Sequence, residues 1–150
     1  MRSYSKLLRR QGVNIGSPIY IDLTTWFDSV DYTKITIEDD VVISREVSVL
    51  VHDYSISRGL VSIGKTLKKE YVIIKPVHIG KNSFIGLRSV IMPGTHIGES
   101  CIIGAGSIVT GKVEPFSIMA GNPAQKIGDI RDWTIKKINE IKDIQDYIGA

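Results

Sequence analysis

The sequence predicts an all-β solenoid, a parallel β-helix built from six-residue units, and three observations lead to this fold class. One aliphatic position recurs every six residues without a slip: Ile79, Ile85, Ile91, Ile97, Ile103 and Val109. A second position, four residues further on, holds small residues: Ser83, Ser89, Thr95, Cys101, Ser107 and Val113. A helical stripe would recur at 3.6 residues and a strand face at 2. A period of six therefore indicates short strands and turns that stack coil upon coil.

Three such units make one triangular coil, so residues eighteen positions apart should be vertical neighbours. Their separation should be about 4.8 Å, the spacing of hydrogen-bonded strands. The predicted pairs are Ile79 with Ile97, Ile85 with Ile103, and Ile91 with Val109.

The same period occurs twice more upstream. One run is Ile37, Ile43 and Val49, and a weaker one is Ile15, Ile21 and Phe27. The period fails at residues 28–34 and 53–76, which are predicted to be loops. We therefore expect coils over residues 12–52 and 77–127, with the loop 53–76 extruded between them.

Both ends of the chain are predicted to be helical. Residues 1–11 can form one or two turns before Gly12 breaks them. At the other end, Asp132 can cap a helix over 132–149, which would close the open end of the stack or pack on a neighbouring subunit. Its aliphatic residues recur every three or four positions: Ile135, Ile138, Ile141, Ile144 and Ile148.

The composition favours one soluble domain over residues 1–150. A net charge of +3, without aromatic residues interleaved among the basic ones, argues against nucleic-acid binding. No apolar run reaches the ~18 residues of a membrane span and no signal peptide is evident, so we expect no membrane insertion and a cytoplasmic location. The single cysteine, Cys101, occupies a small inward position and is predicted to be a packed thiol.

His52 is the histidine in the most suggestive place. It lies three residues after Val49, at a corner of a coil, where the period fails and the segment 53–76 leaves the solenoid. Long loops in compact folds are usually functional, and this one suits a lid or an arm that reaches a neighbouring subunit. From the residues alone, a surface imidazole without a role is the alternative.

Several segments together resemble the hexapeptide-repeat acyltransferases. They are residues 37–43, 50–55 and 77–86, the Gly104-Ala105-Gly106-Ser107 segment within 103–110, and Gly121-Asn122-Pro123-Ala124. Within that family the similarity is to the maltose, galactoside and nodulation O-acetyltransferase group, which includes capsular polysaccharide acetyltransferases. It covers about residues 12–130.

The resemblance implies a left-handed β-helix that assembles as a homotrimer, with active sites in the grooves between subunits. It also implies acetyl-CoA as co-substrate, no metal, and a hydroxyl of a sugar or polysaccharide precursor as acceptor. The family's general base falls on His52. An imidazole with an ordinary pKa of ~6.5 can take the hydroxyl proton as the oxygen attacks the thioester.

Further site residues follow from family position. Asp31 is expected to bind the acceptor sugar, with Trp26 and Asp28 as ring and hydroxyl contacts. The group that orients His52 stays open among Asp53, Asp28, Asp31 and a backbone carbonyl.

The expected contacts to the coenzyme are backbone groups at Leu87 and Ala105, the ring of Phe84, and Thr110. The basic residues that the family places beside the nucleotide phosphates are displaced here by one position, to Lys112 and Lys126. Both lysines are therefore predicted, rather than directly matched, coenzyme contacts.

Three other functions are alternatives. A zinc site of the γ-carbonic-anhydrase type would use His52, His78 and His96, but the last two occupy outward positions and are expected to face solvent. The second is transfer of the acetyl group to an amine of a sugar nucleotide, to serine or to a xenobiotic. It stays open because the loops 22–34 and 53–76 determine the acceptor. A catalytically silent scaffold is the third.

Overall fold

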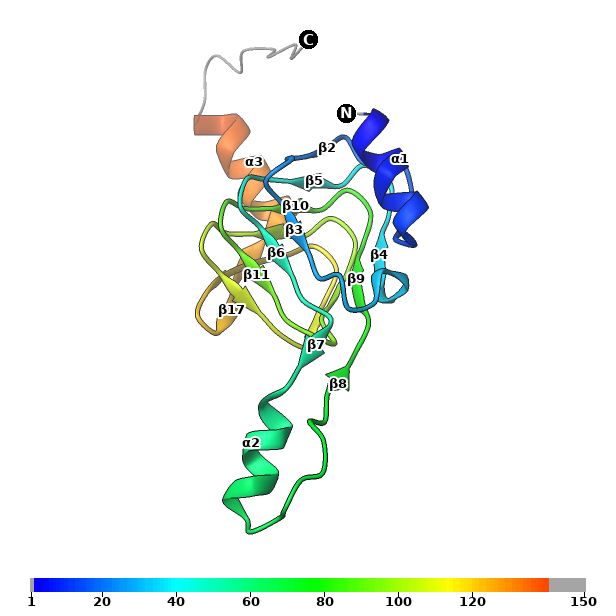
Figure 1. Cartoon of the computed structure of the whole chain (residues 1–150). Helices are drawn as coiled ribbons and strands as arrows, with labels where there is room; N and C mark the ends of the chain where they lie inside the picture. Colours follow the sequence, from blue (N-terminus) through cyan, green and yellow to red (C-terminus); the bar gives the residue numbers. More distant parts are fainter. Residues whose placement is uncertain (1, 141–150) are drawn as a thin grey trace.

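The coils are three-sided stacks of very short parallel strands. The computed structural model describes residues 2–140 and contains three parallel sheets (Figure 1). The first sheet consists of β1 (Asn14–Ile15), β4 (Ile35–Ile37), β9 (Val77–Ile79), β12 (His96–Ile97) and β15 (Lys112–Val113). The parallel strands of the second are β2 (Tyr20–Ile21), β5 (Val42–Ile43), β10 (Phe84–Ile85), β13 (Ile102–Ile103) and β16 (Ser117–Gly121). The third consists of β3 (Trp26–Phe27), β6 (Ser48–Val49), β11 (Val90–Ile91) and β14 (Ile108–Val109).

Successive strands visit the three sheets in turn, so each coil contributes one strand to each side. The predicted register is confirmed: Ile97 pairs with Ile79, Ile103 with Ile85, and Val109 with Ile91. The segment 53–76 adds no strand to the three sheets, and β9 pairs directly with β4. The hand of the coil stays a prediction from the resemblance.

The core is a column of stacked aliphatic side chains that are completely excluded from water, as at Ile43, Ile85 and Ile103. The short inward residues beside them bury hydroxyl groups, which must find acceptors. Ser83 donates to the carbonyl of Gly98 at 3.1 Å, and Ser89 donates to that of Gly104 at 3.0 Å. These hydrogen bonds tie each coil to the next.

Tight corners explain the glycine of the repeat. A Cβ atom on Gly80 would lie 2.6 Å from the carbonyl carbon of Gly98 on the next coil, closer than non-bonded atoms can approach. Other corner residues adopt positive φ, among them Asp40 at 59° and Asn82 at 55°, and both residue types tolerate this region better than most. The period of six is thus required by backbone contacts between coils as well as by core packing.

The segment 53–76 is an arm with secondary structure of its own, which corrects its description as a loop. Its base is formed by β7 (His52–Asp53), which pairs antiparallel with β8 (Ile73–Ile74). Beyond the base lies α2 (Ser55–Ser62), and Figure 1 shows this arm projecting away from the coils. The buried Ser57 hydroxyl joins α2 to the returning chain, since it donates to the Tyr71 carbonyl at 3.1 Å and accepts from the Tyr71 amide at 2.7 Å.

The N-terminal end of the stack is covered by a helix. The helix α1 (Arg2–Gln11) lies over this end and buries Leu8 against the core. The break at 28–34 contains a single 3-10 turn, η1 (Tyr32–Lys34).

The C-terminal end differs from expectation in two respects. Parallel stacking ends at β16, because β17 (Ala124–Asp129) turns back to pair with it antiparallel. The helix α3 (Ile130–Glu140) begins before Asp132, so that residue lies in its first turn and Asp129 accepts the Arg131 amide hydrogen at 2.9 Å. Residues 141–149 of the predicted helix lie outside the described residues. Over 2–140, no helix has the length and apolarity of a membrane span.

Replacing Gly80 with alanine should lower the free energy of unfolding by about 1–3 kcal/mol, the usual cost of overpacking. The opposing atoms are backbone, and they can retreat only by breaking the stack. The matched control is Gly59→Ala in α2, where a Cβ atom meets nothing within 4 Å and alanine is the better helix former. Urea unfolding followed by circular dichroism measures both, and an unchanged midpoint for Gly80→Ala would contradict the proposed contact.

Candidate active site

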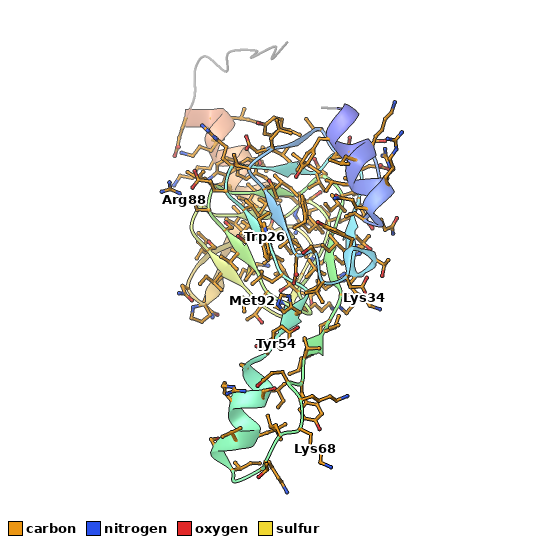
Figure 2. The ribbon with its side chains drawn as sticks, viewed as in Figure 1. Trp26, Lys34, Tyr54, Lys68, Arg88 and Met92 are labelled. Atoms are coloured by element: carbon orange, nitrogen blue, oxygen red, sulfur yellow. The ribbon has the colours of Figure 1, made fainter. Side chains whose placement is uncertain are left out.

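His52 lies at the point where the arm leaves the coils. It is the first residue of β7, three residues after β6 ends, and pairing of β7 with β8 fixes its backbone. Its side chain is 24% exposed, so the ring is held by the protein and still reachable. The ring of Tyr54 packs edge-on against it with centroids 5.2 Å apart, and Figure 2 shows Tyr54 at the root of the arm.

The imidazole is oriented by Asp28, which lies at the same corner one coil earlier. Oδ2 of Asp28 contacts Nδ1 of His52 and accepts the backbone N–H groups of Val51 at 2.9 Å and His52 at 3.1 Å. Oδ1 accepts the N–H of Val30 at 3.1 Å. The carboxylate is 1% exposed, so its charge is compensated by protein donors instead of water.

These contacts determine the charge of Asp28 and the tautomer of His52. Burial by itself raises the pKa of the Asp28 carboxyl, but the hydrogen bonds from Val51, Val30 and His52 outweigh it and leave this pKa below its ordinary value. An ionised carboxylate against Nδ1 requires a hydrogen there. The lone pair of His52 therefore resides on Nε2, where it can accept a proton.

The other carboxylates that were candidates for orienting His52 are engaged elsewhere. Asp53 accepts the backbone N–H and the hydroxyl of Ser55 at 2.7 and 2.8 Å. Asp31 caps η1 and accepts the Thr33 N–H and hydroxyl at 3.0 and 2.6 Å. Asp28 was expected to contact an acceptor hydroxyl, but its 1% exposed carboxylate accepts three backbone N–H groups and contacts His52, which favours a positioning role instead.

Trp26 and the second carboxylate oxygen of Asp31, Oδ2, which takes no part in the η1 cap, remain available to an acceptor. Trp26 points outward from β3 and is 49% exposed, whereas the next residue, Phe27, fills the core. Asp31 is partly exposed in the break that follows β3. Both residues are within five positions of Asp28 in the chain.

The expected coenzyme contacts lie on different edges of the coil stack. Leu87 and Ala105 are neighbours at the corner between the second and third sheets, where the Gly106 N–H donates to the Leu87 carbonyl at 2.7 Å. Thr110 follows β14 at the corner after the third sheet. His52 follows β6 at the same corner. Phe84 projects from the second sheet and is 41% exposed. One chain therefore does not bring these residues together around His52.

The two predicted phosphate-binding lysines are both exposed. Lys112 lies on β15 in the first sheet and its ammonium group pairs with Glu114 at 2.8 Å. Lys126 lies on β17, opposite Met119. They too occupy separate faces of one chain.

His78 and His96 form a stacked pair on the first sheet. Their rings are nearly parallel, 14° apart with centroids at 4.4 Å, and Nε2 of His78 is 3.2 Å from Glu38. Burial, followed by the proximity of His96, lowers the pKa of His78. His78 is thus partly buried instead of facing solvent, and the Glu38 contact was not predicted. No group of three or more potential metal ligands occurs within 2–140.

Comparison with known proteins gives consistent matches. A model described as the hexapeptide repeat of succinyl-transferase matches residues 76–111. Galactoside O-acetyltransferase of Escherichia coli K12 is 38% identical over 120 residues, which is 80% of this chain and 55% of that protein. The protein CapG of Staphylococcus aureus is 39% identical over 135 residues, covering 86% of this chain and 73% of CapG. The chain thus spans about half the length of the first of these relatives.

Solved structures give a similar result. The crystal structure of a maltose O-acetyltransferase from Clostridium difficile 630 is 25% identical and superimposes with a TM-score of 0.62, over 86% of this chain and 75% of that one. A galactoside acetyltransferase in complex with coenzyme A has the same TM-score at 22% identity, which bears on the fold alone.

Asp28→Asn should lower the free energy of unfolding by about 1–3 kcal/mol at pH 7, because an amide group cannot accept all the hydrogen bonds that the carboxylate accepts. The difference from the unchanged protein should shrink below about pH 4. A carboxyl whose folded pKa is depressed stabilises the fold above its unfolded pKa of ~3.9, and loses that contribution as the pH falls through its folded value.

Asp40→Asn is the control, since Asp40 is exposed and asparagine also adopts its positive φ. Thermal unfolding at pH 7, 5 and 3 follows both variants. Equal melting temperatures for Asp28→Asn and Asp40→Asn at pH 7 would contradict the role assigned to the Asp28 charge.

Proposed function

Because the chain belongs to the hexapeptide-repeat acyltransferase family, we propose that it is an acetyl-CoA-dependent O-acetyltransferase whose acceptor is a hydroxyl of a sugar or polysaccharide precursor. The observation that carries this proposal is the contact of His52 with the buried carboxylate of Asp28, which leaves Nε2 as a fixed proton acceptor. The names of two relatives support a sugar acceptor, since one is a galactoside and the other a maltose O-acetyltransferase.

In the proposed reaction His52 is the general base. Nε2 takes the proton of the acceptor hydroxyl while the oxygen attacks the thioester carbonyl carbon of acetyl-CoA. The tetrahedral intermediate collapses with cleavage of the carbon–sulfur bond. The imidazolium then returns the proton to the departing thiolate, so that the products are the acetyl ester and free coenzyme A.

Asp28 serves this reaction in two ways. Its carboxylate keeps the hydrogen on Nδ1 and stabilises the imidazolium that forms, and its buried hydrogen bonds hold the ring in place. A positioned general base is worth about 10²–10⁴ in rate. Backbone N–H groups at the stacked corners would add stabilisation of the oxyanion, typically about 3–4 kcal/mol for one donor.

The proposed assembly is a homotrimer of left-handed coils. Its support is that the residues expected to contact the coenzyme and the acceptor lie on separate edges of one chain: Leu87 and Ala105 on one corner, His52 and Thr110 on another. A crevice between two protomers would combine an edge of each. In this arrangement Phe84, Lys112 and Lys126 would contact the coenzyme beyond its thioester arm, and the use of acetyl-CoA fits the cytoplasmic location expected from the sequence.

His52→Ala should lower acetyl transfer by about 10²–10⁴ and leave coenzyme A affinity and oligomeric mass unchanged. The matched control is His96→Ala, which removes an exposed imidazole from the first sheet and should leave the rate unaltered. Release of free thiol from acetyl-CoA measures transfer, and light scattering measures mass. Near-normal turnover of His52→Ala would remove this residue from the role of base.

The class of acceptor is tested by the same thiol-release assay on a panel of sugars, sugar nucleotides, serine and chloramphenicol. We expect transfer to saccharide hydroxyls and not to amines or serine. Preferred transfer to an amine would replace the proposed acceptor while keeping the mechanism. Absence of any thermal stabilisation by coenzyme A would instead indicate a silent scaffold.

A further inference from the structure

Two adjoining pockets flank α1 at the N-terminal end of the coils. The smaller one, about 310 Å³, lies between α1 and β3 and is lined by Tyr4, Gln11, Trp26, Ser29 and Tyr32, among others. The larger one, about 520 Å³, lies between α1 and β2, and its lining includes Tyr4, Ser5, Ser17 and Tyr20. Tyr4 lines both. Each volume falls within the range of about 300–1,000 Å³ that is usual for small-molecule sites.

The lining of these pockets combines aromatic faces with short hydrogen-bonding groups. A sugar ring has an apolar C–H face, which packs on aromatic rings, and a rim of hydroxyls, which bond to serine, tyrosine and amide groups. Trp26 is not needed for the core, because Phe27 fills the inward position of β3 and Trp26 is 49% exposed. This ring is therefore available to pack on the apolar face of a sugar in the adjoining pocket.

The lining of the smaller pocket comes within one residue of Asp28 along the chain. Its wall includes Ser29, the residue that follows Asp28, and Asp28 holds His52. Trp26 pairs in register with Ser48 of β6, the strand whose end leads to His52. Figure 2 shows Trp26 between the end of the coil covered by α1 and the root of the arm marked by Tyr54. A sugar unit in this pocket would therefore lie next to the reactive corner.

Tyr4 connects the two pockets. Its hydroxyl donates to the Thr25 carbonyl at 3.4 Å, and its pKa is raised by burial and then by the nearby Tyr32 and Asp22. Asp22 in turn accepts the hydroxyl of Tyr20 at 2.6 Å. Aromatic side chains thus line both pockets, from Tyr32 in the smaller one through Tyr4 to Tyr20 in the larger one.

We propose that these two pockets form one saccharide-binding groove, so that the acceptor is a chain of at least two sugar units whose end beside Asp28 and His52 is acetylated. This inference rests on the proposed function and names the form of its acceptor. It also makes α1 a wall of the acceptor site.

The charges in the groove favour a saccharide over a nucleotide sugar. Arg9 lines the larger pocket, but its guanidinium is used within the protein: Nε donates to the Ile15 carbonyl at 2.9 Å, and a terminal nitrogen donates to that of Gly16. Of the basic residues that line this pocket, only Lys6 then remains for an anion. A diphosphate would need more than one such group, whereas a neutral or singly charged sugar does not.

Trp26 provides a direct measurement of binding. In Trp133→Phe it is the only tryptophan of the chain, so quenching of its fluorescence reports occupancy of the smaller pocket. The probes are polysaccharide fragments of one to six sugar units from bacterial capsules. We expect at least one fragment of two or more units to bind about 10-fold tighter than its monosaccharide. Equal binding of monosaccharides and longer fragments, or no quenching by any fragment, would overturn the groove.

Kinetics provide an independent test. Trp26→Ala should lower kcat/KM for the preferred fragment by about 2-fold to 10-fold, the value of one aromatic packing contact. Trp133→Ala is the control, because Trp133 is similarly exposed, 46%, on α3 and should leave the rate unchanged. Equal losses in both variants would refute the groove.

The two proposals fail in different ways. Tight binding of a fragment that is never acetylated would refute the proposed function and support the groove. Acetylation of monosaccharides with the same kcat/KM as longer fragments would support the function and overturn the groove.

Discussion

The structure depends on the stacking of one coil on the next. Most of its strands are only two residues long, and a pair of such strands has no stability of its own in water. Stability arises because inward aliphatic residues stack on one another from coil to coil and because buried hydroxyls such as that of Ser83 donate to the neighbouring coil, here to Gly98. The backbones approach so closely that Gly80 has no room for a Cβ atom. Every position is therefore set by the coil beneath it, which makes the scaffold rigid enough to position a catalytic group.

Asp28 and His52 use this rigidity at a place where the repeat stops. A buried carboxylate is expensive unless it is fully hydrogen-bonded, and here the N–H groups of Val30, Val51 and His52 provide three donors. The cost of burial is offset by the backbone of two successive coils meeting at one corner. The same contacts decide which imidazole nitrogen carries the hydrogen. The proposed base is thus prepared by the fold, and the ring needs only to meet a hydroxyl.

Departures from the repeat are the parts that would give this scaffold its specificity. The break at 28–34 and the arm between β7 and β8 interrupt the coils beside the corner that carries His52, and α1 covers the N-terminal end of the stack. The coils themselves present similar faces at every level. A scaffold of this kind can keep one reaction and change its acceptor through such departures, and the two pockets beside α1 lie among them instead of along the regular faces.

The sequence alone determined the period of six, and through it the parallel coils, the pairing of Ile79 with Ile97 and the location of His52 where the period fails. These features are local and repeated, so each unit confirms the others. Tertiary structure decided the rest: Asp28 as the partner of His52, the helix within 53–76, the return of β17 and the contact of Glu38 with His78. Asp28 is 24 positions from His52, in a coil interrupted by an irregular break, and linear spacing cannot tell which of several carboxylates faces the ring. Only the stacking of the two coils brings that carboxylate and the imidazole together.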